Sequence, residues 1–321
     1  MNEKTPRLLV LVGPTGSGKT ETAIRLAESL NGEIISADSR YFFKELKIGT
    51  AKPGLDERGD IPHHLIDVTD LDHPWSLGEF IIEAKKFVID INERGRFPIL
   101  VGGSGQYIHA ITENWSVPAQ EPDHRLRDQI ELIGSQIGFE KLHMMLSWVD
   151  PQASRIIDAR NHRRTIRALE VMMLSGYRFS DLRQTKEPIY DQLIIGINWS
   201  REELYVRIDK RINQMISGGL IEETKSVINA GKTDQLSKTG IIGYTEMLYY
   251  LAGKTTLEET IRLIRRNTRR FIRHQANWFK PDDAAINWFN AQDPAMLENM
   301  LGLVRNRFQI KPQVSRESPD S

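Results

Sequence analysis

The chain alternates short apolar runs with longer stretches in which apolar residues recur at helical spacing. Runs that suit buried strands occur at residues 8–12, 33–37, 65–68, 98–101 and 193–197. Helical stretches separate most of them. This alternation predicts a parallel β-sheet covered by helices.

Three Ser or Thr residues followed three positions later by Glu mark helix starts, because each pair can form a capping box. The first of these helices is expected to close at Arg94 and Gly95, and the third, which is long and rich in arginine, to end before Pro281. The pairs are Ser76 and Glu79, Ser200 and Glu203, and Thr256 and Glu259.

Residues 118–190 contain no good strand pattern, whereas 125–137 and 163–174 have helical periodicity. We therefore expect a helical insertion domain at 118–190 within an α/β core made of 1–117 and 191–310. The segment 311–321 is polar with two prolines, and it is expected to be a disordered tail.

The sequence GPTGSGKT fits the phosphate-loop pattern G-x-x-x-x-G-K-[ST] and lies between the first apolar run and a helical stretch that ends at Asn31 and Gly32. Glycines there let backbone N–H groups converge on phosphate oxygens, Lys19 adds a charge, and the Thr20 hydroxyl can ligate Mg²⁺. The predicted fold is therefore like that of a P-loop NTPase. The diphosphate-binding residues are Gly13, Pro14, Thr15, Gly16, Ser17, Gly18, Lys19 and Thr20.

In a phosphate-loop protein that hydrolyses nucleotides, an acid at the end of a second apolar strand also helps to hold the Mg²⁺. Asp38, which ends the second apolar run, is the best candidate and Asp67 is its competitor. His63 and His64 raise the question of zinc, but adjacent residues on an extended segment point to opposite sides. A loop or core role is favoured for both histidines.

The 321 residues carry 43 Lys plus Arg against 43 Asp plus Glu, so the formal net charge is zero and no general basic coat exists. The absence of Cys excludes disulfides and thiolate zinc sites. With neither a signal-like N-terminus nor an apolar run near 18 residues, the expectation is a soluble cytoplasmic protein.

Two local basic patches stand out, at 262–273 with six arginines and no acid, and at 160–167. Together they suggest a track for a polyanion.

These motifs resemble the tRNA dimethylallyltransferases, also called tRNA isopentenyltransferases, in order from about residue 8 to 280. The matching segments beyond the phosphate loop are ISADSRYFFKELKIGTAKP (35–53), IPHHLIDV (61–68), VGGSGQYIHAI (101–111), RNHRRTIRALEV (160–171), RINQMISGGLIEE (211–223), GIIGYTEMLYYLAG (240–253) and RRNTRRFIRHQANWFK (265–280). A chain of this bacterial type, lacking the cysteines of a zinc finger, is expected to act as a monomer.

The resemblance implies transfer of the dimethylallyl group of dimethylallyl diphosphate to N6 of the adenosine just 3′ of the anticodon, in tRNAs that read codons beginning with U. It implies Mg²⁺ near Thr20, Asp38 as the base that removes the N6 proton, and Thr15 and Arg211 as further catalytic residues, with Arg211 reaching the diphosphate from the far side. The implied tRNA contacts, made to the anticodon loop, are Asp38, Ser39, Arg40, Tyr41, Ser104, Arg127, Arg163, Arg164, Arg167, Gly240, Ile241, Ile242, Gly243, Tyr244 and Thr245.

The chain departs from the family pattern at two places. Tyr41 stands where the family has a glutamine that reads anticodon-loop bases, so that hydrogen bond is replaced by an aromatic ring able to stack. Ser104 keeps a hydroxyl in a glycine-rich loop, while Gln106 replaces a leucine.

Three alternatives stay open from the residues alone. A P-loop kinase would need a second Mg²⁺-binding acid and a lid arginine pair, neither of which is convincing here. An adenylate isopentenyltransferase acting on free AMP, ADP or ATP would need neither the helical insertion nor the arginine-rich helix. An RNA-binding protein with a vestigial phosphate loop would not need Lys19, Thr20, Asp38 and Arg211.

Overall fold

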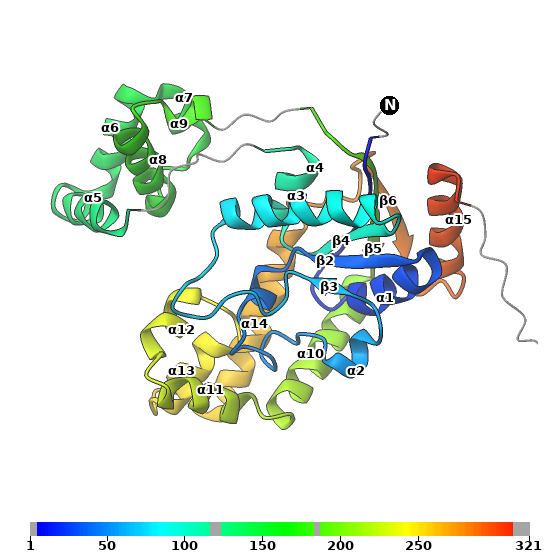
Figure 1. Cartoon of the computed structure of the whole chain (residues 1–321). Helices are drawn as coiled ribbons and strands as arrows, with labels where there is room; N and C mark the ends of the chain where they lie inside the picture. Colours follow the sequence, from blue (N-terminus) through cyan, green and yellow to red (C-terminus); the bar gives the residue numbers. More distant parts are fainter. Residues whose placement is uncertain (1–4, 116–122, 183–186, 311–321) are drawn as a thin grey trace, which may run out of the picture. The chain divides into compact units, whose positions relative to one another are not determined.

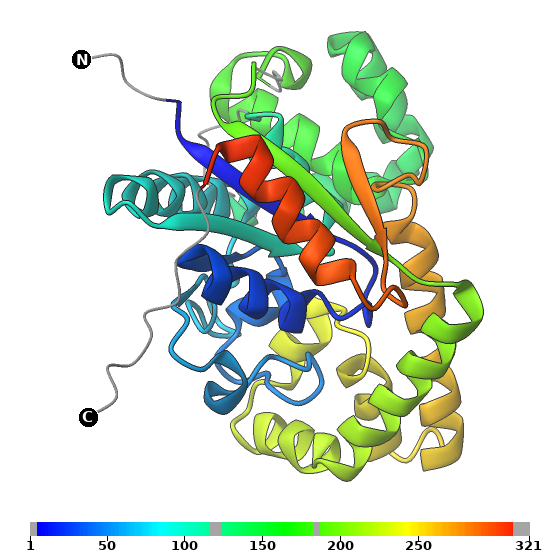
Figure 2. The same cartoon turned by 90° about the vertical axis from the view of Figure 1, so that its right-hand side faces the viewer.

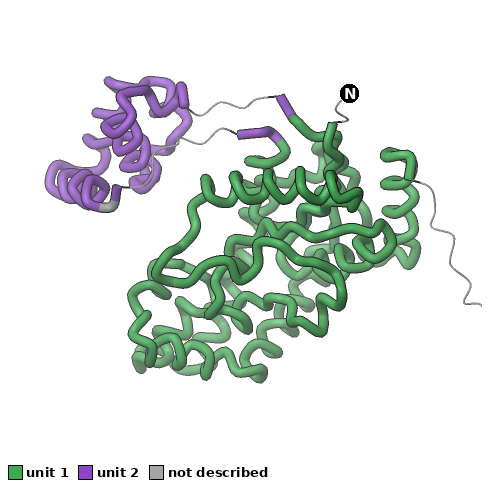
Figure 3. Tube along the Cα trace, viewed as in Figure 1, with its two compact units in different colours: residues 1–112, 189–321 green, residues 113–188 purple. Residues whose placement is uncertain are grey.

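The computed structural model describes residues 5–115, 123–182 and 187–310, and these form two compact units. The first unit comprises residues 1–112 and 189–321, and the second comprises residues 113–188 (Figure 3). The sequence analysis predicted the helical insertion domain at 118–190. The predicted tail at 311–321 lies outside the described residues.

The first unit is built on a six-stranded sheet with the order β3-β2-β4-β1-β5-β6, in which every pairing is parallel (Figure 1). This confirms the predicted parallel α/β fold. The strands are β1 (Arg7–Val12), β2 (Gly32–Ser36), β3 (His63–His64), β4 (Phe97–Gly102), β5 (Asp191–Asn198) and β6 (Ile286–Asn290).

Helices cover both faces of the sheet, which explains why β1, β2 and β4 read as continuous apolar runs. On one face, α1 (Lys19–Leu30) and α15 (Met296–Phe308) pack in a core that includes Leu9, Leu11, Ile99 and Val304. On the other, α3 (Leu77–Glu93) contacts β1, β2 and β4 and is followed in sequence by β4 and α4 (Gly105–Thr112) (Figure 2). The central strand β1 therefore has both faces buried.

The strand expected at 65–68 is wrong. Strand β3 contains only His63 and His64, because Leu65 and Asp67 have φ angles of 61° and 59°. Residues in this left-handed region cannot continue a strand. Strand β6, at the opposite edge of the sheet, was not expected.

Five further helices of the first unit pack around a second hydrophobic core, which includes Leu204, Ile208, Tyr244, Met247 and Ile264. These helices are α10 (Arg201–Ser217), α11 (Leu220–Asn229), α12 (Thr233–Thr239), α13 (Tyr244–Leu251) and α14 (Leu257–Gln275). Two short helices, η1 (Ser39–Phe42) and α2 (Leu55–Arg58), lie in the segment that follows β2.

The predicted helix starts are confirmed. Ser76 and Thr256 each exchange hydrogen bonds with the Glu three positions later, and the Ser200 hydroxyl accepts from the amide of Glu203. The predicted end of α3 at Arg94 is confirmed as well, with Gly95 in the left-handed region at φ 71°.

The regular elements of the second unit, in the part of it that the structure describes, are helices. The unit contains α5 (His124–Ile137), α6 (Phe139–Val149), α7 (Pro151–Ile156), α8 (His162–Ser175) and α9 (Phe179–Leu182) around a separate core that includes Ile130, Leu142, Leu146 and Ile166. The helical periodicity at 125–137 and 163–174 is thus confirmed. Across the described parts of both units, no helix is long and apolar enough to cross a lipid bilayer.

Candidate active site

The phosphate loop connects β1 to α1, and its glycines are required by geometry. Gly16 and Gly18 have φ angles of 85° and 91°, which disfavour residues with a side chain. A Cβ on Gly16 would lie 2.7 Å from Cδ1 of Ile208. The loop can therefore follow this path, with its amides near the N-terminus of α1, only because glycine stands at these positions.

Two hydroxyl groups in the loop are buried without a partner. Among the described residues, neither Oγ1 of Thr15 nor Oγ of Ser17 makes a hydrogen bond. Buried polar atoms normally have partners. The two hydroxyls, the loop amides and the nearby lysine therefore fit an anionic ligand with several oxygen acceptors.

Lys19 lies at the centre of the site. Its Nζ donates hydrogen bonds to the carbonyl oxygens of Gly13 and Pro14 at 2.9 and 2.8 Å. Burial lowers the pKa of Lys19 to about 7; Asp38 opposes this shift, while Arg211 and Arg40 add to it. Because these interactions act over short distances, the structure brings Lys19, Asp38, Arg40 and Arg211 together in one site.

Asp38 follows β2 and is buried. Its carboxylate accepts from Nε and Nη2 of Arg40 at 2.9 and 2.6 Å, and also from the Arg40 amide at 3.2 Å. Burial alone would raise the pKa of Asp38, but the charge and hydrogen bonds of Arg40, together with the charge of Lys19, hold it below its usual value. Asp38 is therefore an ionised acid next to the phosphate loop.

Two tyrosines border the Asp38 carboxylate. The Tyr41 hydroxyl donates to the carbonyl oxygen of Ala51 at 3.1 Å, and burial followed by the charge of Asp38 raises the pKa of Tyr41. Burial likewise raises the pKa of Tyr107 to about 12, against a hydrogen bond to Ser39. Tyr107 was not predicted as a site residue, although its motif was noted.

Arg211, on α10, donates to the carbonyl oxygen of Thr50 at 3.0 Å. Glu223 anchors the loop that carries Thr50, because its carboxylate accepts hydrogen bonds from the amides of residues 47, 48 and 49 at 3.0 to 3.2 Å. The Tyr244 hydroxyl also bonds Glu223 and accepts from the Gly49 amide at 3.1 Å. This network fixes the backbone against which Arg211 is positioned.

The segment 240–245 was predicted to contact RNA, and its members differ in exposure. The side chains of Ile241 and Tyr244 are buried in the helical core, and Tyr244 serves the Glu223 network. We therefore correct the prediction for these two side chains, since a fully buried phenol is not available to RNA. Gly240 is exposed, while Ile242 and Thr245 are half-buried.

The glycine-rich loop after β4 packs tightly against α14 and the residues that follow it. A Cβ on Gly103 would lie 2.5 Å from Nε2 of Gln275, and one on Gly105 would lie 2.1 Å from Trp278. Ser104, between these glycines, is half-buried, and its carbonyl oxygen accepts the amides of Tyr107 and Ile108 at the start of α4. The predicted contact residue Ser104 thus lies at the turn that begins α4.

Three residues that the sequence analysis did not single out form hydrogen bonds with the phosphate loop, and one of them is Trp199, whose Nε1 donates to the Ser17 carbonyl oxygen at 3.0 Å. The Gln275 side chain accepts from the Thr15 amide at 2.9 Å and donates to the Gly103 carbonyl oxygen at 2.8 Å. Nε of Arg207 donates to the Gly16 carbonyl oxygen at 3.0 Å, and its guanidinium stacks over the Trp199 ring. Because Gln275 is 260 positions from Thr15, no local sequence signal could have paired them.

The competing acid and the two histidines have other partners. Asp67 forms ion pairs with Lys52 at 2.6 Å and Arg58 at 3.6 Å. His64 pairs with Glu33 at 2.6 Å, and Nδ1 of His63 bonds the Ile61 carbonyl oxygen. The described residues contain no group of three or more acids and histidines arranged to hold a metal ion. The contacts of His64 with Glu33 and of His63 with the Ile61 carbonyl oxygen fit the loop or core role preferred for the two histidines.

In the second unit, the predicted RNA-binding arginines divide into two kinds. Arg127 and Arg167 form ion pairs with the buried carboxylate of Glu170 at 2.7 and 3.0 Å. Arg163 and Arg164, at the start of α8, are exposed. The first pair therefore stabilises the fold of the unit, whereas the second pair is accessible to a ligand.

Comparison with known proteins places this site in a family. The family model described as IPP transferase matches residues 41–282. The tRNA dimethylallyltransferase of Thermomicrobium roseum is 39% identical over 300 residues, covering 94% of this chain and 91% of that protein. The enzyme of the same name from Chloroflexus aurantiacus is 44% identical over 273 residues, covering 85% and 92%.

Solved structures agree. The tRNA isopentenylpyrophosphate transferase of Bacillus halodurans matches with a TM-score of 0.71 and 37% identity, covering 95% of this chain and 97% of that chain. A eukaryotic dimethylallyltransferase acting on tRNA matches with a TM-score of 0.81 and 25% identity, covering 97% and 81%. The chain therefore belongs to the IPP transferase family, together with the curated tRNA dimethylallyltransferases.

Proposed function

We propose that this protein transfers the dimethylallyl group of dimethylallyl diphosphate to N6 of the adenosine on the 3′ side of the tRNA anticodon, in tRNAs that read codons beginning with U. One observation carries the proposal. An ionised, buried carboxylate, Asp38, lies beside the lysine of a phosphate loop, so a base and a diphosphate cradle share one site. A site for prenyl transfer to an amine needs this combination.

The roles of the site residues follow from the bonds that break and form in the reaction. The bond between the allylic carbon and the diphosphate oxygen breaks, and its electron pair leaves with diphosphate. A new bond forms between that carbon and N6, which loses a proton. The adenine amine is a poor nucleophile, so Asp38 accepts this proton.

The leaving diphosphate gains negative charge, and the phosphate loop is built to stabilise it. The unpaired hydroxyls of Thr15 and Ser17 supply hydrogen-bond donors, and so do the loop amides other than those of Thr15 and Ser17, which already bond Gln275 and the Pro14 carbonyl oxygen. Lys19 and Arg211 supply positive charge, and an anion beside Lys19 restores the protonated form that burial disfavours. Arg207 and Gln275 do not donate to the diphosphate in this account; they hold the loop in shape.

Mg²⁺ is proposed to bind at the Thr20 hydroxyl together with diphosphate oxygens. Mg²⁺ sites often use one or two protein oxygens and complete their coordination with substrate phosphates and water. That habit fits a site whose described residues include no dedicated acid cluster. When bound, the ion supplies further positive charge to the leaving group.

The acceptor must leave the anticodon stack to reach Asp38. Ser39, Tyr41 and Ser104 lie on the segments that border Asp38 in the first unit, and the Tyr41 ring is suited to stacking on a base. In the second unit, the exposed Arg163 and Arg164 are proposed to contact phosphates. The protein is proposed to work as a monomer.

The experiment that tests the proposal offers the purified protein, with Mg²⁺ and labelled dimethylallyl diphosphate, unmodified tRNA in one reaction and AMP or ATP in another. Label in tRNA alone supports the proposal. Label in the free nucleotide would move the protein to the adenylate isopentenyltransferases, and label in neither would require tests for kinase activity.

A further inference from the structure

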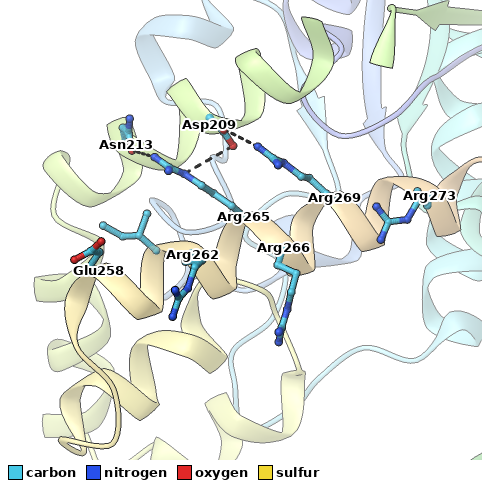
Figure 4. Close-up of a pocket in the computed structure, with 9 residues that line it drawn as sticks. Asp209, Asn213, Glu258, Arg262, Arg265, Arg266, Arg269 and Arg273 are labelled. Carbon is cyan, nitrogen blue, oxygen red and sulfur yellow. Dashed lines mark hydrogen bonds and ion pairs between the residues drawn. The ribbon is translucent and has the colours of Figure 1, made fainter. Parts of the chain in front are cut away.

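A groove of about 730 Å³ between α10 and α14 concentrates positive charge (Figure 4). It lies wholly within the first unit. Five arginines line it against two acids, Asp209 and Glu258, which leaves an excess of three positive charges. The arginines are Arg262, Arg265, Arg266, Arg269 and Arg273, all on α14.

Two of these arginines hold the helices together. Nη2 of Arg269 pairs with Asp209 at 2.7 Å, and the Arg269 guanidinium stacks on the ring of Tyr205. Arg265 donates to Asn213 at 2.9 Å and lies 3.8 Å from Asp209. One acid on α10 therefore fixes Arg265 and Arg269 in place (Figure 4).

The other three arginines are exposed and are not needed to join the helices. Within the described residues, no acid forms an ion pair with Arg262, Arg266 or Arg273, and Arg273 reaches only the Tyr205 hydroxyl at 3.5 Å. Figure 4 shows Arg262 and Arg266 extending away from Asp209. Arg262 follows Glu258 and Glu259 by one turn, whereas Arg266 and Arg273 have only like charges on the adjacent turns, which destabilises a helix unless an anion binds.

The groove is long and open, and one end lies near the active site. The twelve residues from Arg262 to Arg273 span about 16 Å of helix. Two positions after Arg273, Gln275 bonds the phosphate loop, and on the facing helix Arg207 bonds Gly16. A single diphosphate would use one or two cations, whereas a track of this length suits several successive phosphates.

We propose that this groove binds the sugar–phosphate backbone of the RNA substrate, with Arg262, Arg266 and Arg273 as the contacting residues. The inference rests on the proposed function and extends it. It adds to the anticodon-loop contacts near Asp38 a second anchoring surface that is independent of base sequence, because phosphate contacts position RNA without reading it.

The test compares two triple variants that remove the same charge. One is Arg262→Gln, Arg266→Gln and Arg273→Gln; the control is Arg25→Gln, Arg201→Gln and Lys225→Gln, at exposed positions outside the groove. The dissociation constant for unmodified tRNA is measured across a salt series without dimethylallyl diphosphate. We expect the groove variant to bind about tenfold more weakly at moderate salt, with a salt slope smaller by about two to three, and the control to change much less.

Equal losses in the two variants would overturn the proposal, because the effect would then reflect net charge alone. A raised KM for dimethylallyl diphosphate with unchanged tRNA affinity would also overturn it, and would assign the groove to the diphosphate substrate. Prenyl transfer by the wild-type protein is scored separately. If the wild-type protein modifies tRNA while the groove variant keeps full affinity, only the groove proposal fails; if it modifies only free nucleotides, the proposed function fails.

Discussion

Arg40 covers both carboxylate oxygens of Asp38, with contacts of 2.9 and 2.6 Å, while its guanidinium stacks over the ring of Phe271 at 5.2 Å. Within the described residues, Oδ1 accepts two of the Arg40 contacts and Oδ2 accepts one. Because a carboxylate oxygen has two lone pairs, Oδ2 can still accept from the incoming N6 amine while Arg40 stays in place. This relationship makes Arg40 a positioning residue for the proposed base.

Replacing Asp38 with Asn should remove the base while keeping its shape. We expect prenyl transfer to fall by about 10²-fold to 10⁴-fold, while tRNA affinity stays close to that of the wild-type protein. Single-turnover transfer and a tRNA binding assay on the same preparation measure the two effects. Near-normal transfer by Asp38→Asn would show that another group accepts the proton.

Replacing Arg40 with Met should change the pH dependence of transfer. Arg40 holds the pKa of Asp38 below its usual value, so its removal raises that pKa and moves the acidic limb of kcat/KM to higher pH. A second variant, Arg40→Lys, keeps a positive charge, so its acidic limb should stay nearer that of the wild-type protein. Both variants retain Lys19, Tyr41 and Tyr107, which also face Asp38. If Arg40→Met and wild-type profiles coincide, Arg40 does not control Asp38.

Gln275→Ala should loosen the phosphate loop. The variant leaves the Thr15 amide and the Gly103 carbonyl oxygen without their buried partner. We expect a loss of about 1–3 kcal/mol in the free energy of unfolding and a raised KM for dimethylallyl diphosphate, with tRNA affinity little changed. Urea unfolding and initial-rate kinetics check both. An unchanged KM would show that the loop keeps its shape without Gln275.

Glu33 should contribute to stability in a defined pH window. Hydrogen bonding by Arg94, opposed by burial and assisted by His64, lowers the pKa of Glu33 to about 2. Because the folded pKa lies below the unfolded value of about 4.5, the unfolded chain binds more protons between these two pH values. The contribution, at most about 3 kcal/mol, is therefore complete above about pH 4.5 and is lost as the pH falls to about 2.

Unfolding free energies of the wild-type protein and Glu33→Gln across this window check the prediction. The variant should be less stable at neutral pH, and its stability should decline less steeply on acidification. Parallel declines in the two proteins would mean that Glu33 does not carry this acid sensitivity.

The exposed and paired arginines of the second unit should respond differently to substitution. Arg163→Gln with Arg164→Gln should weaken tRNA binding and flatten its salt dependence, without lowering thermal stability. Arg127→Gln should instead destabilise the unit, because it removes a partner of the buried Glu170. Salt-series binding and thermal unfolding separate these effects. An unchanged salt slope in the double variant would show that Arg163 and Arg164 face solvent and do not contact tRNA phosphates.

The elements that the sequence predicted correctly are those with local signals. The phosphate loop is defined by eight consecutive residues, and the caps at Ser76 and Thr256 by pairs three residues apart. The mistaken strand at 65–68 had a suitable apolar pattern, but in the structure the ion pair of Asp67 with Lys52 accompanies a left-handed turn. That pairing depends on a loop whose path the pattern does not reveal.

The long-range parts of the site were not predictable from one sequence. Arg207 and Gln275 reach the phosphate loop across 191 and 260 positions, and although Gln275 lies in the arginine-rich segment 265–280, nothing in that segment pairs it with Thr15. The division of the arginines into paired and exposed sets likewise depends on contacts between helices: Asp209 on α10 pairs with Arg269 on α14, and Arg127 on α5 pairs with Glu170 on α8. Such pairings follow from packing rather than from local pattern.

Prenyl transfer with Asp38 as the base is tested most directly by mass-spectrometric nucleoside analysis of unmodified tRNA after incubation with dimethylallyl diphosphate, Mg²⁺ and either the wild-type protein or Asp38→Asn. We expect the wild-type protein to convert the adenosine 3′ of the anticodon to its N6-dimethylallyl derivative, and Asp38→Asn to leave it unmodified while still binding the tRNA. Unmodified adenosine with the wild-type protein, or equal conversion by the variant, would contradict this mechanism.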